Sequence, residues 1–343
     1  MKFATYNVEW FTNLFDENGN LLRDDKWSGR RDVTRAQQIE ALGAVFQAID
    51  ADAVMVIEAP DTSRKRDGIA ALETFAKTFG LRARSVVTGF SNDTQQEIAL
   101  LYDPNAVSAT HDPMGEDAGL EGSRNAPRFD GVFRLDLDID ASDEAIRWSK
   151  PPLELALETK TGSRLRLIGV HAKSKAPHGA RDEADAMRIS IENRRKQLAQ
   201  CLWLRQRVDQ VISSGEDVIV LGDFNDGPGL DTYEKLFGQS GVEIVLGSDT
   251  APKLRLFDPH AQAAILEKIS TPYATSRFYL HHEGRYLNAL LDYVMVSERL
   301  RARNPDWHIW HPFDDQKCWD CGDMRDALLT ASDHFPVTLD IAL

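Results

Sequence analysis

The sequence is poor in cysteine and has no long apolar run. Only three cysteines occur in 343 residues, an odd number that is too small for a disulfide framework and fits a reducing compartment. No stretch approaches the run of about 18 apolar residues that spans a bilayer, and residues 1–5 lack the apolar core of a secretory signal. We therefore expect a cytoplasmic protein without membrane contact.

Basic residues are outnumbered by acidic ones. Lys and Arg total 40 against 54 Asp and Glu, which gives a formal net charge of −14. This balance disfavours a protein that coats nucleic acid nonspecifically, because such binding depends on neutralising phosphates with Lys and Arg. It does not exclude a nuclease, because a carboxylate-rich site for divalent cations is itself acidic until it is loaded.

Short apolar runs rich in Val, Ile and Leu alternate with helical patterns, which is typical of an α/β protein. A capping box formed by Thr34 and Gln37 predicts the start of one helix, and a second, long helix is predicted over 182–212. Residues 112–130, rich in Gly, Pro and charge, are expected to form a surface loop. Strands are predicted over 3–8, 53–57, 98–102, 132–137, 153–157, 165–170, 218–221 and 293–296.

Polar side chains stand where several predicted strands begin or end, and such positions in a parallel or mixed sheet present functional groups. Each residue taken alone has a structural explanation, such as a turn for Asn7, a helix cap for Glu58 or a core histidine for His171. Together they offer oxygen ligands, a carboxamide and two histidines, the groups that metal-assisted hydrolysis of a phosphate diester requires. The set is Asn7, Glu58, His171, Asp223, Asp292, Asp333 and His334.

Six short motifs contain these residues: Thr5-Tyr6-Asn7-Val8-Glu9-Trp10, Val56-Ile57-Glu58, Gly169-Val170-His171-Ala172-Lys173-Ser174-Lys175, Leu221-Gly222-Asp223-Phe224-Asn225, Leu291-Asp292-Tyr293-Val294 and Ser332-Asp333-His334-Phe335-Pro336. In this order they resemble the signatures of the endonuclease/exonuclease/phosphatase superfamily, the deoxyribonuclease I-like group. The resemblance extends over nearly the whole chain. It implies a four-layer α/β sandwich, in which two packed mixed β-sheets are flanked by helices, with a metal site at one end.

The resemblance also implies a role for each matched residue. Glu58 corresponds to the principal metal carboxylate, with Asn7 and Asp333 beside it, and oxygen ligands of this kind suit Mg²⁺ or Mn²⁺. Asp223 is expected to orient or deprotonate the attacking water, and Asn225 to hold a phosphate oxygen. The reaction implied is in-line attack of water on phosphorus.

Other matched residues have supporting roles. Asp292 and His334 resemble a carboxylate–histidine dyad, in which the acid fixes the imidazole tautomer. His171 resembles the second histidine of the deoxyribonuclease I and sphingomyelinase branches, and Glu97 stands where its carboxylate partner is expected. Weaker candidates for contact with the substrate are Tyr102, Arg128 and Lys173.

Departures from the pattern narrow the function. His171 stands where apurinic endonucleases commonly carry another residue, and the inositol polyphosphate 5-phosphatase signature is missing around Asp292, so both branches are disfavoured. Residues 222–228 resemble a segment of several nuclease branches, including deadenylases. We rank a nuclease acting on DNA or RNA first. A phosphodiesterase or phosphatase for a small-molecule or lipid phosphate ester is the alternative, and an inactive scaffold of the same fold is a remote one, because the full set of active-site residues is present.

A second constellation consists of His308, His311, Cys318 and Cys321, spaced as His-x-x-His and Cys-x-x-Cys. Two imidazoles and two thiolates at such spacings can close a tetrahedral structural Zn²⁺ site. The alternative is a surface loop packed by tryptophans, in which the cysteines stay free thiols, because a single Cys-x-x-Cys is a weak signal. The sequence leaves both interpretations open.

Substrate choice in this fold is expected to lie in the loops. We expect one domain over 1–343, with loop insertions near 112–130 and 240–285, and a further specificity loop over 23–35. A nucleic acid substrate is the partner we expect, and no obligate protein partner is inferred.

Overall fold

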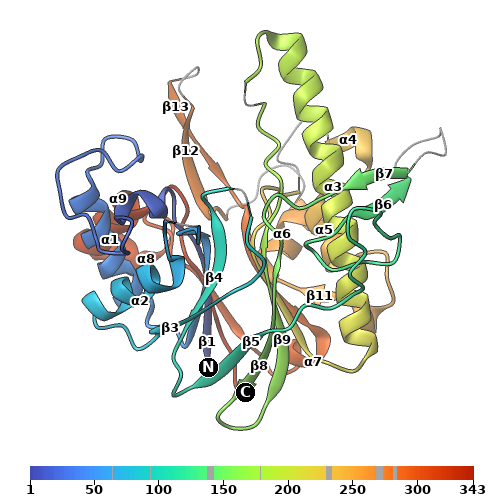
Figure 1. The fold of residues 1–343 in the computed structure, drawn as a ribbon, viewed down its shortest axis with the longest axis horizontal. Helices are drawn as coiled ribbons and strands as arrows, with labels where there is room; N and C mark the ends of the chain where they lie inside the picture. Colours follow the sequence, from blue (N-terminus) through green and yellow to red (C-terminus); the bar gives the residue numbers. More distant parts are fainter. Residues whose placement is uncertain are drawn as a thin grey trace.

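The computed structural model describes residues 1–63, 65–92, 94–136, 143–177, 179–228, 234–267, 273–280 and 284–343. Two six-stranded mixed sheets lie face to face, and helices cover the outer face of each (Figure 1). This arrangement is the four-layer α/β sandwich predicted from the sequence. Both chain termini lie at one end of the sandwich, where the amino group of Met1 donates a hydrogen bond to the carbonyl of Ile341.

Each sheet contains one parallel pair of strands among antiparallel neighbours. The parallel pairs are β1 (Lys2–Asn7) with β2 (Ala53–Ala59) and β9 (Arg164–His171) with β10 (Val218–Asp223). The first sheet has the order β15 (Asp306–Ile309), β16 (Val337–Asp340), β1 (Lys2–Asn7), β2 (Ala53–Ala59), β4 (Glu97–Tyr102) and β3 (Ser85–Thr88). The second has the order β11 (Leu256–Phe257), β14 (Asp292–Ser297), β10 (Val218–Asp223), β9 (Arg164–His171), β8 (Leu153–Thr159) and β5 (Val107–His111).

The central strands are buried on both faces, which explains why their sequences are continuous apolar runs. In β2, Met55 and Ile57 belong to the core between the sheets, whereas Val54 and Val56 belong to the core beneath the helices. The sheets approach closely where β9 carries Gly169, because a Cβ at this position would lie 2.4 Å from Sδ of Met55. A glycine therefore lets the side chains of Met55 and Ile98 pack directly against the backbone of β9.

The helices form the two outer layers. On the first sheet, α1 begins at the predicted capping box, with reciprocal hydrogen bonds between Thr34 and Gln37. On the second sheet, α3 is the predicted long helix, and Asp182 caps its first turn. The helices are α1 (Arg35–Ile49), α2 (Gly68–Thr78), α3 (Glu183–Ser213), α4 (Glu234–Phe237), α5 (Gly241–Leu246), α6 (Pro259–Glu267), α7 (Glu298–Arg301), α8 (Gln316–Asp320) and α9 (Gly322–Ala331), with 3-10 turns η1 (Phe11–Leu14) and η2 (Pro252–Leu254).

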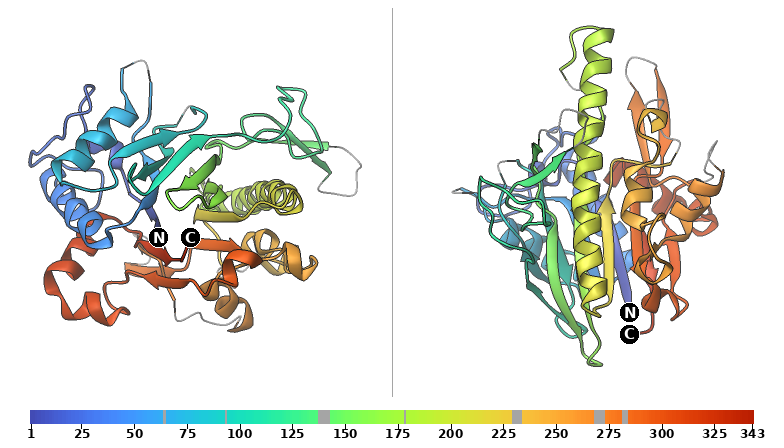
Figure 2. Two further views of the ribbon diagram at one scale, coloured as in Figure 1. Left: turned by 90° about the horizontal axis from the view of Figure 1, so that it is seen from below. Right: turned by 90° about the vertical axis from the view of Figure 1, so that its right-hand side faces the viewer.

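Two hairpins stand apart from the main sheets. β12 (Ser276–Leu280) pairs with β13 (Arg285–Ala289), and this hairpin projects at the same end of the molecule as the start of α3 (Figures 1 and 2). β6 (Phe133–Asp136) pairs with β7 (Asp143–Ile146). The strand predicted over 132–137 is thus part of a separate hairpin and not of a main sheet, and Leu137 lies outside the described residues.

The predicted loop regions differ in content. Residues 112–130 contain no helix or strand, as predicted. The region 240–285 is only partly loop, because its described residues include α5, β11, α6 and β12. In the described part of the chain, no helix is both long and apolar enough to cross a membrane.

Candidate active site

A cavity of about 800 Å³ opens at the end of the sandwich where β1, β2, β9 and β10 finish. The carboxyl ends of parallel strands meet at one edge of a sheet, so polar residues that follow them converge. Of the predicted site residues, those that line this cavity are Asn7, Glu58, His171, Lys173, Asp223, Asn225, Asp333 and His334.

A β-bulge places Glu58 in the cavity. The register between β2 and β4 shifts between Ile57 and Ala59, and Glu58 itself has a left-handed backbone with φ 62°. Such bulges redirect a side chain out of the ladder and are frequent beside active sites. Burial raises the pKa of Glu58 to about 7, while the nearby charge of Lys150 acts to lower it and that of Asp333 to raise it.

Asp223 lies between residues from both sheets. Its Oδ2 accepts a hydrogen bond from Nδ2 of Asn7 at 3.0 Å, and its Oδ1 accepts one from the backbone N–H of Asn225 at 2.7 Å. Burial raises the pKa of Asp223 to about 6. Asn225 has φ 49° and donates from Nδ2 to the carbonyl of Ala172 at 3.1 Å, so a left-handed turn fixes its amide beside the carboxylate.

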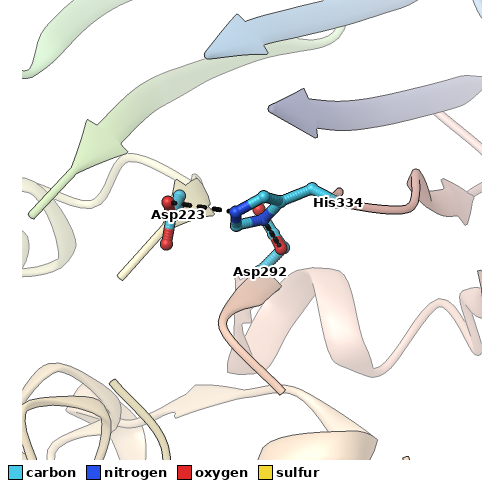
Figure 3. Close-up of side chains that lie close together, drawn as sticks. All are labelled: Asp223, Asp292 and His334. Atoms are coloured by element: carbon cyan, nitrogen blue, oxygen red, sulfur yellow. Dashed lines mark hydrogen bonds and ion pairs between the residues drawn. The ribbon is translucent and has the colours of Figure 1, made fainter. Parts of the chain in front are cut away.

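The predicted hydrogen bond between Asp292 and His334 is present. Oδ2 of Asp292 lies 2.7 Å from Nδ1 of His334, and the other ring nitrogen, Nε2, lies 4.0 Å from Oδ2 of Asp223 (Figure 3). Burial acts to lower the pKa of His334, but the charge of Asp292 and its hydrogen bond outweigh burial, and the pKa is raised well above its ordinary value. The dyad thus holds an imidazolium whose Nε2 faces Asp223.

Two hydroxyl groups position these segments. Oγ of Ser332 accepts hydrogen bonds from the backbone N–H groups of Glu9 and His334 and donates to the carbonyl of Asn7. Oγ1 of Thr275 accepts from the backbone N–H of Asp292 at 2.9 Å. Ser332 therefore links the end of β1 to the His334 segment, and Thr275, just before β12, is linked to the start of β14.

The carboxylate partner of His171 differs from the prediction. Nε2 of His171 lies 3.9 Å from Oε1 of Glu58 and 3.8 Å from Oδ2 of Asp223. Glu97 instead accepts a hydrogen bond from Nδ2 of Asn92 at 2.8 Å, and no contact between Glu97 and His171 is seen. Asn92 thus binds the carboxylate of Glu97, which we had expected to pair with His171.

Lys150 is a site residue that sequence reasoning missed. Its Nζ lies 3.2 Å from both ring nitrogens of His171, and its side chain lines the cavity. Burial lowers the pKa of Lys150, while Glu58 and Asp223 act to raise it. Burial and the charge of Lys150 also lower the pKa of His171 well below its ordinary value, so this histidine is neutral. Lys150 stands before two prolines, a common surface pattern, so the sequence did not indicate that it belongs to the site.

Gln197 on α3 was missed for a similar reason. Its Nε2 donates to the backbone carbonyls of Lys173, Phe224 and Asn225 at 3.1, 3.0 and 2.9 Å. A buried glutamine therefore holds together the two loops that carry Lys173 and Asn225. A polar residue on a long helix is ordinarily expected on the solvent face, and only the fold reveals its partners.

Two of the weaker candidates lie away from the cavity. Tyr102 stands at the end of β4 opposite to Glu97, where it pairs with Ala53 of β2. Arg128 forms ion pairs with Asp117 and Asp130. The structure brings neither residue to the predicted catalytic groups, whereas Lys173 lines the cavity.

The four zinc candidates do not converge on one point in the part of the chain that the structure describes. Nε2 of His308 and Sγ of Cys318 both contact Asp315, at 2.8 and 2.9 Å, and Cys321 is exposed. Nδ1 of His311 accepts a hydrogen bond from the backbone N–H of residue 314. Asp315 thus contacts both His308 and Cys318, two of the four residues considered for zinc, and the segment forms a hydrogen-bonded turn.

The cavity residues fit a hard divalent cation. Oδ1 of Asn7 is buried and has no hydrogen-bond partner, and the ionisation of Glu58 is disfavoured by burial, so a cation beside them would satisfy both. Donor atoms of Asp223, Asp292 and His334 also lie within 4.8 Å of one another. We favour the oxygen-rich set of Asn7, Glu58 and Asp333, because His334 and Asp292 are already engaged with each other and hard cations prefer oxygen ligands.

Comparisons with two solved TDP2 structures show the same fold. A truncated Caenorhabditis elegans TDP2 is 14% identical, with a TM-score of 0.52 over 99% of this chain and 97% of that chain. A D. rerio TDP2 complexed with single strand DNA product is 12% identical, with a TM-score of 0.51 over 100% and 99%. A mannosyl-6-phosphatase from Bacteroides thetaiotaomicron is 13% identical, with a TM-score of 0.49 over 100% of both chains. No curated protein sequence matches the chain.

The family model described as the Endonuclease/Exonuclease/phosphatase family matches residues 4–334, a range that contains five of the six motifs in full, the sixth up to His334, and every residue that lines the cavity. The chain therefore belongs to the Endonuclease/Exonuclease/phosphatase family and is a phosphoesterase of that family.

Proposed function

We propose that this phosphoesterase is a nuclease that hydrolyses phosphodiester bonds with Mg²⁺ or Mn²⁺. The observation that carries the proposal is the arrangement around Oδ2 of Asp223. This oxygen accepts a hydrogen bond from Nδ2 of Asn7, and it lies 3.8 Å from Nε2 of His171 and 4.0 Å from Nε2 of His334. These groups surround a space where one phosphate and one water can be held together.

The cation would be held by Glu58 and Asp333 with the free Oδ1 of Asn7, and when bound it would neutralise the phosphate and stabilise the charge that develops on it. Asp223 accepts a proton from the attacking water, and its pKa of about 6 makes it a stronger base than an ordinary aspartate. The water oxygen bonds to phosphorus as the bond to the leaving oxygen breaks, and the leaving oxygen takes a proton from solvent.

His334 stabilises the phosphate oxygens in this reaction. Asp292 holds the Nδ1 proton, so the imidazolium directs Nε2–H toward the cavity. Lys150 and Lys173 add positive charge on the same cavity wall as His171. Several cationic groups around one cavity suit the binding of an anionic phosphate ester.

A nucleic acid substrate is favoured over a small phosphate ester because the cavity lies at the end of the sandwich from which α3 and the β12–β13 hairpin both project (Figure 1). A strand could enter between them. The D. rerio TDP2 structure, which has this fold, holds a single strand DNA product, and this supports the idea that the fold can present its site to a strand.

The proposal is tested by hydrolysis of labelled single- and double-stranded DNA and RNA with Mg²⁺, Mn²⁺ or EDTA. We expect metal-dependent cleavage that Asp223→Asn lowers by several orders of magnitude. Asp249→Asn, at an exposed position, is the matched control. Failure to cleave any polymer, with turnover of a small phosphate ester that Asp223→Asn abolishes, would replace the nuclease by a small-molecule phosphoesterase. If no substrate is hydrolysed with or without a divalent metal, the protein would be an inactive scaffold of the same fold.

A further inference from the structure

The β12–β13 hairpin gives the active-site cavity an apolar wall. Side chains on a strand alternate between its two faces, and Phe278 and Leu280 of β12 line the cavity together with Leu287 of β13. Phe278 and Leu287 are directly opposed across the hairpin. The wall is therefore one face of a regular two-stranded ribbon, and none of these three side chains can donate or accept a hydrogen bond.

The rest of the cavity lining has a different character. Lys150, His171 and Lys173 line the cavity, together with the residues assigned to phosphate and metal. A ligand that fills the cavity thus meets both charged groups and an apolar surface. Such a division suits a ligand that is itself half anionic and half apolar or planar.

The apolar wall begins at the catalytic centre. The ring centroid of Phe278 lies 5.5 Å from that of His334 in an edge-on arrangement, and the backbone N–H of Arg277 donates to the carbonyl of Asp333 at 2.7 Å. A phosphate positioned by His334 therefore has its ester substituent within reach of Phe278. The wall is therefore within reach of a substituent carried by the scissile phosphate, such as a base that is joined to it through the sugar.

We propose that this wall receives an unstacked nucleobase of the nucleotide at the scissile phosphate, and that Phe278, Leu280 and Leu287 thereby determine specificity. This inference rests on the proposed nuclease function. A base has a planar apolar face that can pack on an aromatic ring, and its edge can remain exposed to water. A sugar or polyol at the same place would bury hydroxyl groups against side chains that offer no hydrogen bonds, which is unfavourable.

The proposal has a consequence for strand choice. A base inside a duplex is stacked on its neighbours, and it reaches a pocket only after it leaves the stack. Because the wall is part of the catalytic cavity and not of the outer surface, we expect single strands or unpaired ends to be cleaved faster than continuous duplex.

An abasic substitution tests the wall directly. The probe is a 5′-labelled 20-nucleotide single strand, of DNA or RNA according to the polymer cleaved, with one abasic tetrahydrofuran site, and gels give the cleavage rate at each linkage. We expect the wild type to cleave one linkage beside the abasic site at least tenfold more slowly than the same linkage in the unmodified strand, the order expected for loss of one base–aromatic contact.

The variants identify the residues responsible. Leu287→Ala and Leu280→Ala leave the contact between Phe278 and His334 intact, and each should slow cleavage of the unmodified strand more than that of the abasic strand. Phe278→Ala should remove most of the difference in cleavage rate between the unmodified and the abasic strand. Asn288→Ala is the matched control, since it changes the exposed neighbour on the opposite face of β13 and should keep the wild-type ratio.

The outcomes distinguish the base-binding wall from the proposed nuclease function. Equal cleavage of normal and abasic strands by the wild type, or unchanged discrimination in all three wall variants, would overturn the base-binding wall while the nuclease stands. If the wild type cleaves no strand at all but still hydrolyses a small phosphate ester, the nuclease function and the base-binding wall are both overturned.

Discussion

The side-chain amide of Asn7 donates a hydrogen bond to Oδ2 of Asp223 across 216 residues of sequence. Asn7 ends β1 of the first sheet and Asp223 ends β10 of the second. The contact therefore couples the metal side of the site to the residue that we assign to the attacking water. It also orients the amide, because donation from Nδ2 leaves Oδ1 free for a cation.

Replacing Asn7 should weaken metal use more than it weakens the fold. In Asn7→Ala the cation loses one oxygen ligand and Asp223 loses a donor that helps to orient it. We expect the metal concentration for half-maximal activity to rise by about 10- to 100-fold, the usual cost of losing a residue that supports a metal site. A metal titration of activity measures this, with Asn288→Ala as the control. An unchanged metal requirement would exclude Asn7 from the ligand set.

Asp292 should act entirely through His334. In Asp292→Asn the amide cannot stabilise the imidazolium and can hold the wrong tautomer, so we expect kcat to fall by about 10²-fold or more with little change in KM. Steady-state kinetics test the split, and circular dichroism reports folding. Asp306→Asn, an exposed aspartate on β15, provides the comparison. Combining Asp292→Asn with His334→Ala should cost little beyond His334→Ala alone, and additive losses would contradict a shared role.

The sequence predicts well what is local. Strand ends follow from apolar runs that stop at a polar residue, so Asn7, His171 and Asp223 were placed at the site from the pattern alone. The capping box at Thr34 is equally local, and the first helix begins where it indicates. Each of these predictions depends on residues within a few positions of one another.

Side-chain contacts made within and between loops could not be predicted in this way. Lys150 approaches His171 from a loop beyond β7, and Asn92 takes up Glu97, because of how loops pack over the ends of the sheets. Asp315 lies between His308 and Cys318 and was not considered as a partner, since metal-ligand spacing drew attention to histidine and cysteine alone. Geometry, and not spacing, decides such pairings.

Gly222 should be essential for stability. It has φ 138°, and a Cβ there would lie 2.0 Å from the carbonyl oxygen of Val170 on the neighbouring strand β9. We expect Gly222→Ala to lower the free energy of unfolding by about 3 kcal/mol or more, because strain and a backbone clash add together. Gly215→Ala is a suitable reference, since Gly215 has φ 89° but open space around it, and should cost about 1–2 kcal/mol.

Urea denaturation of both glycine variants separates the two effects. The reference variant reports the backbone conformation alone, and the difference between the variants reports the contact between β10 and β9. Equal losses of stability would show that the strands can separate without cost, and the close approach at Gly222 would then have no energetic importance.

Divalent cations should stabilise the folded protein through Glu58. A ligand that binds only the native state adds about 2.7 kcal/mol at a concentration 100 times its dissociation constant, so we expect Mg²⁺ or Mn²⁺ to raise the thermal midpoint by several degrees and EDTA to reverse the shift. Glu58→Gln should abolish the shift, and Glu73→Gln, at an exposed position on α2, should retain it. A full shift in Glu58→Gln would place the cation elsewhere.

Gln197 should affect catalysis without touching the substrate. Gln197→Met keeps the size of the side chain but leaves the carbonyls of Lys173, Phe224 and Asn225 without their shared donor. We expect a loss of stability of about 1–3 kcal/mol and a fall in kcat/KM of at least tenfold, because the loops that present Lys173 and Asn225 lose their fixed spacing. Gln206→Met on the same helix is the control. If the variant lost stability but kept full activity below its melting temperature, Gln197 would support the fold alone, and the spacing of the two loops would not limit the reaction.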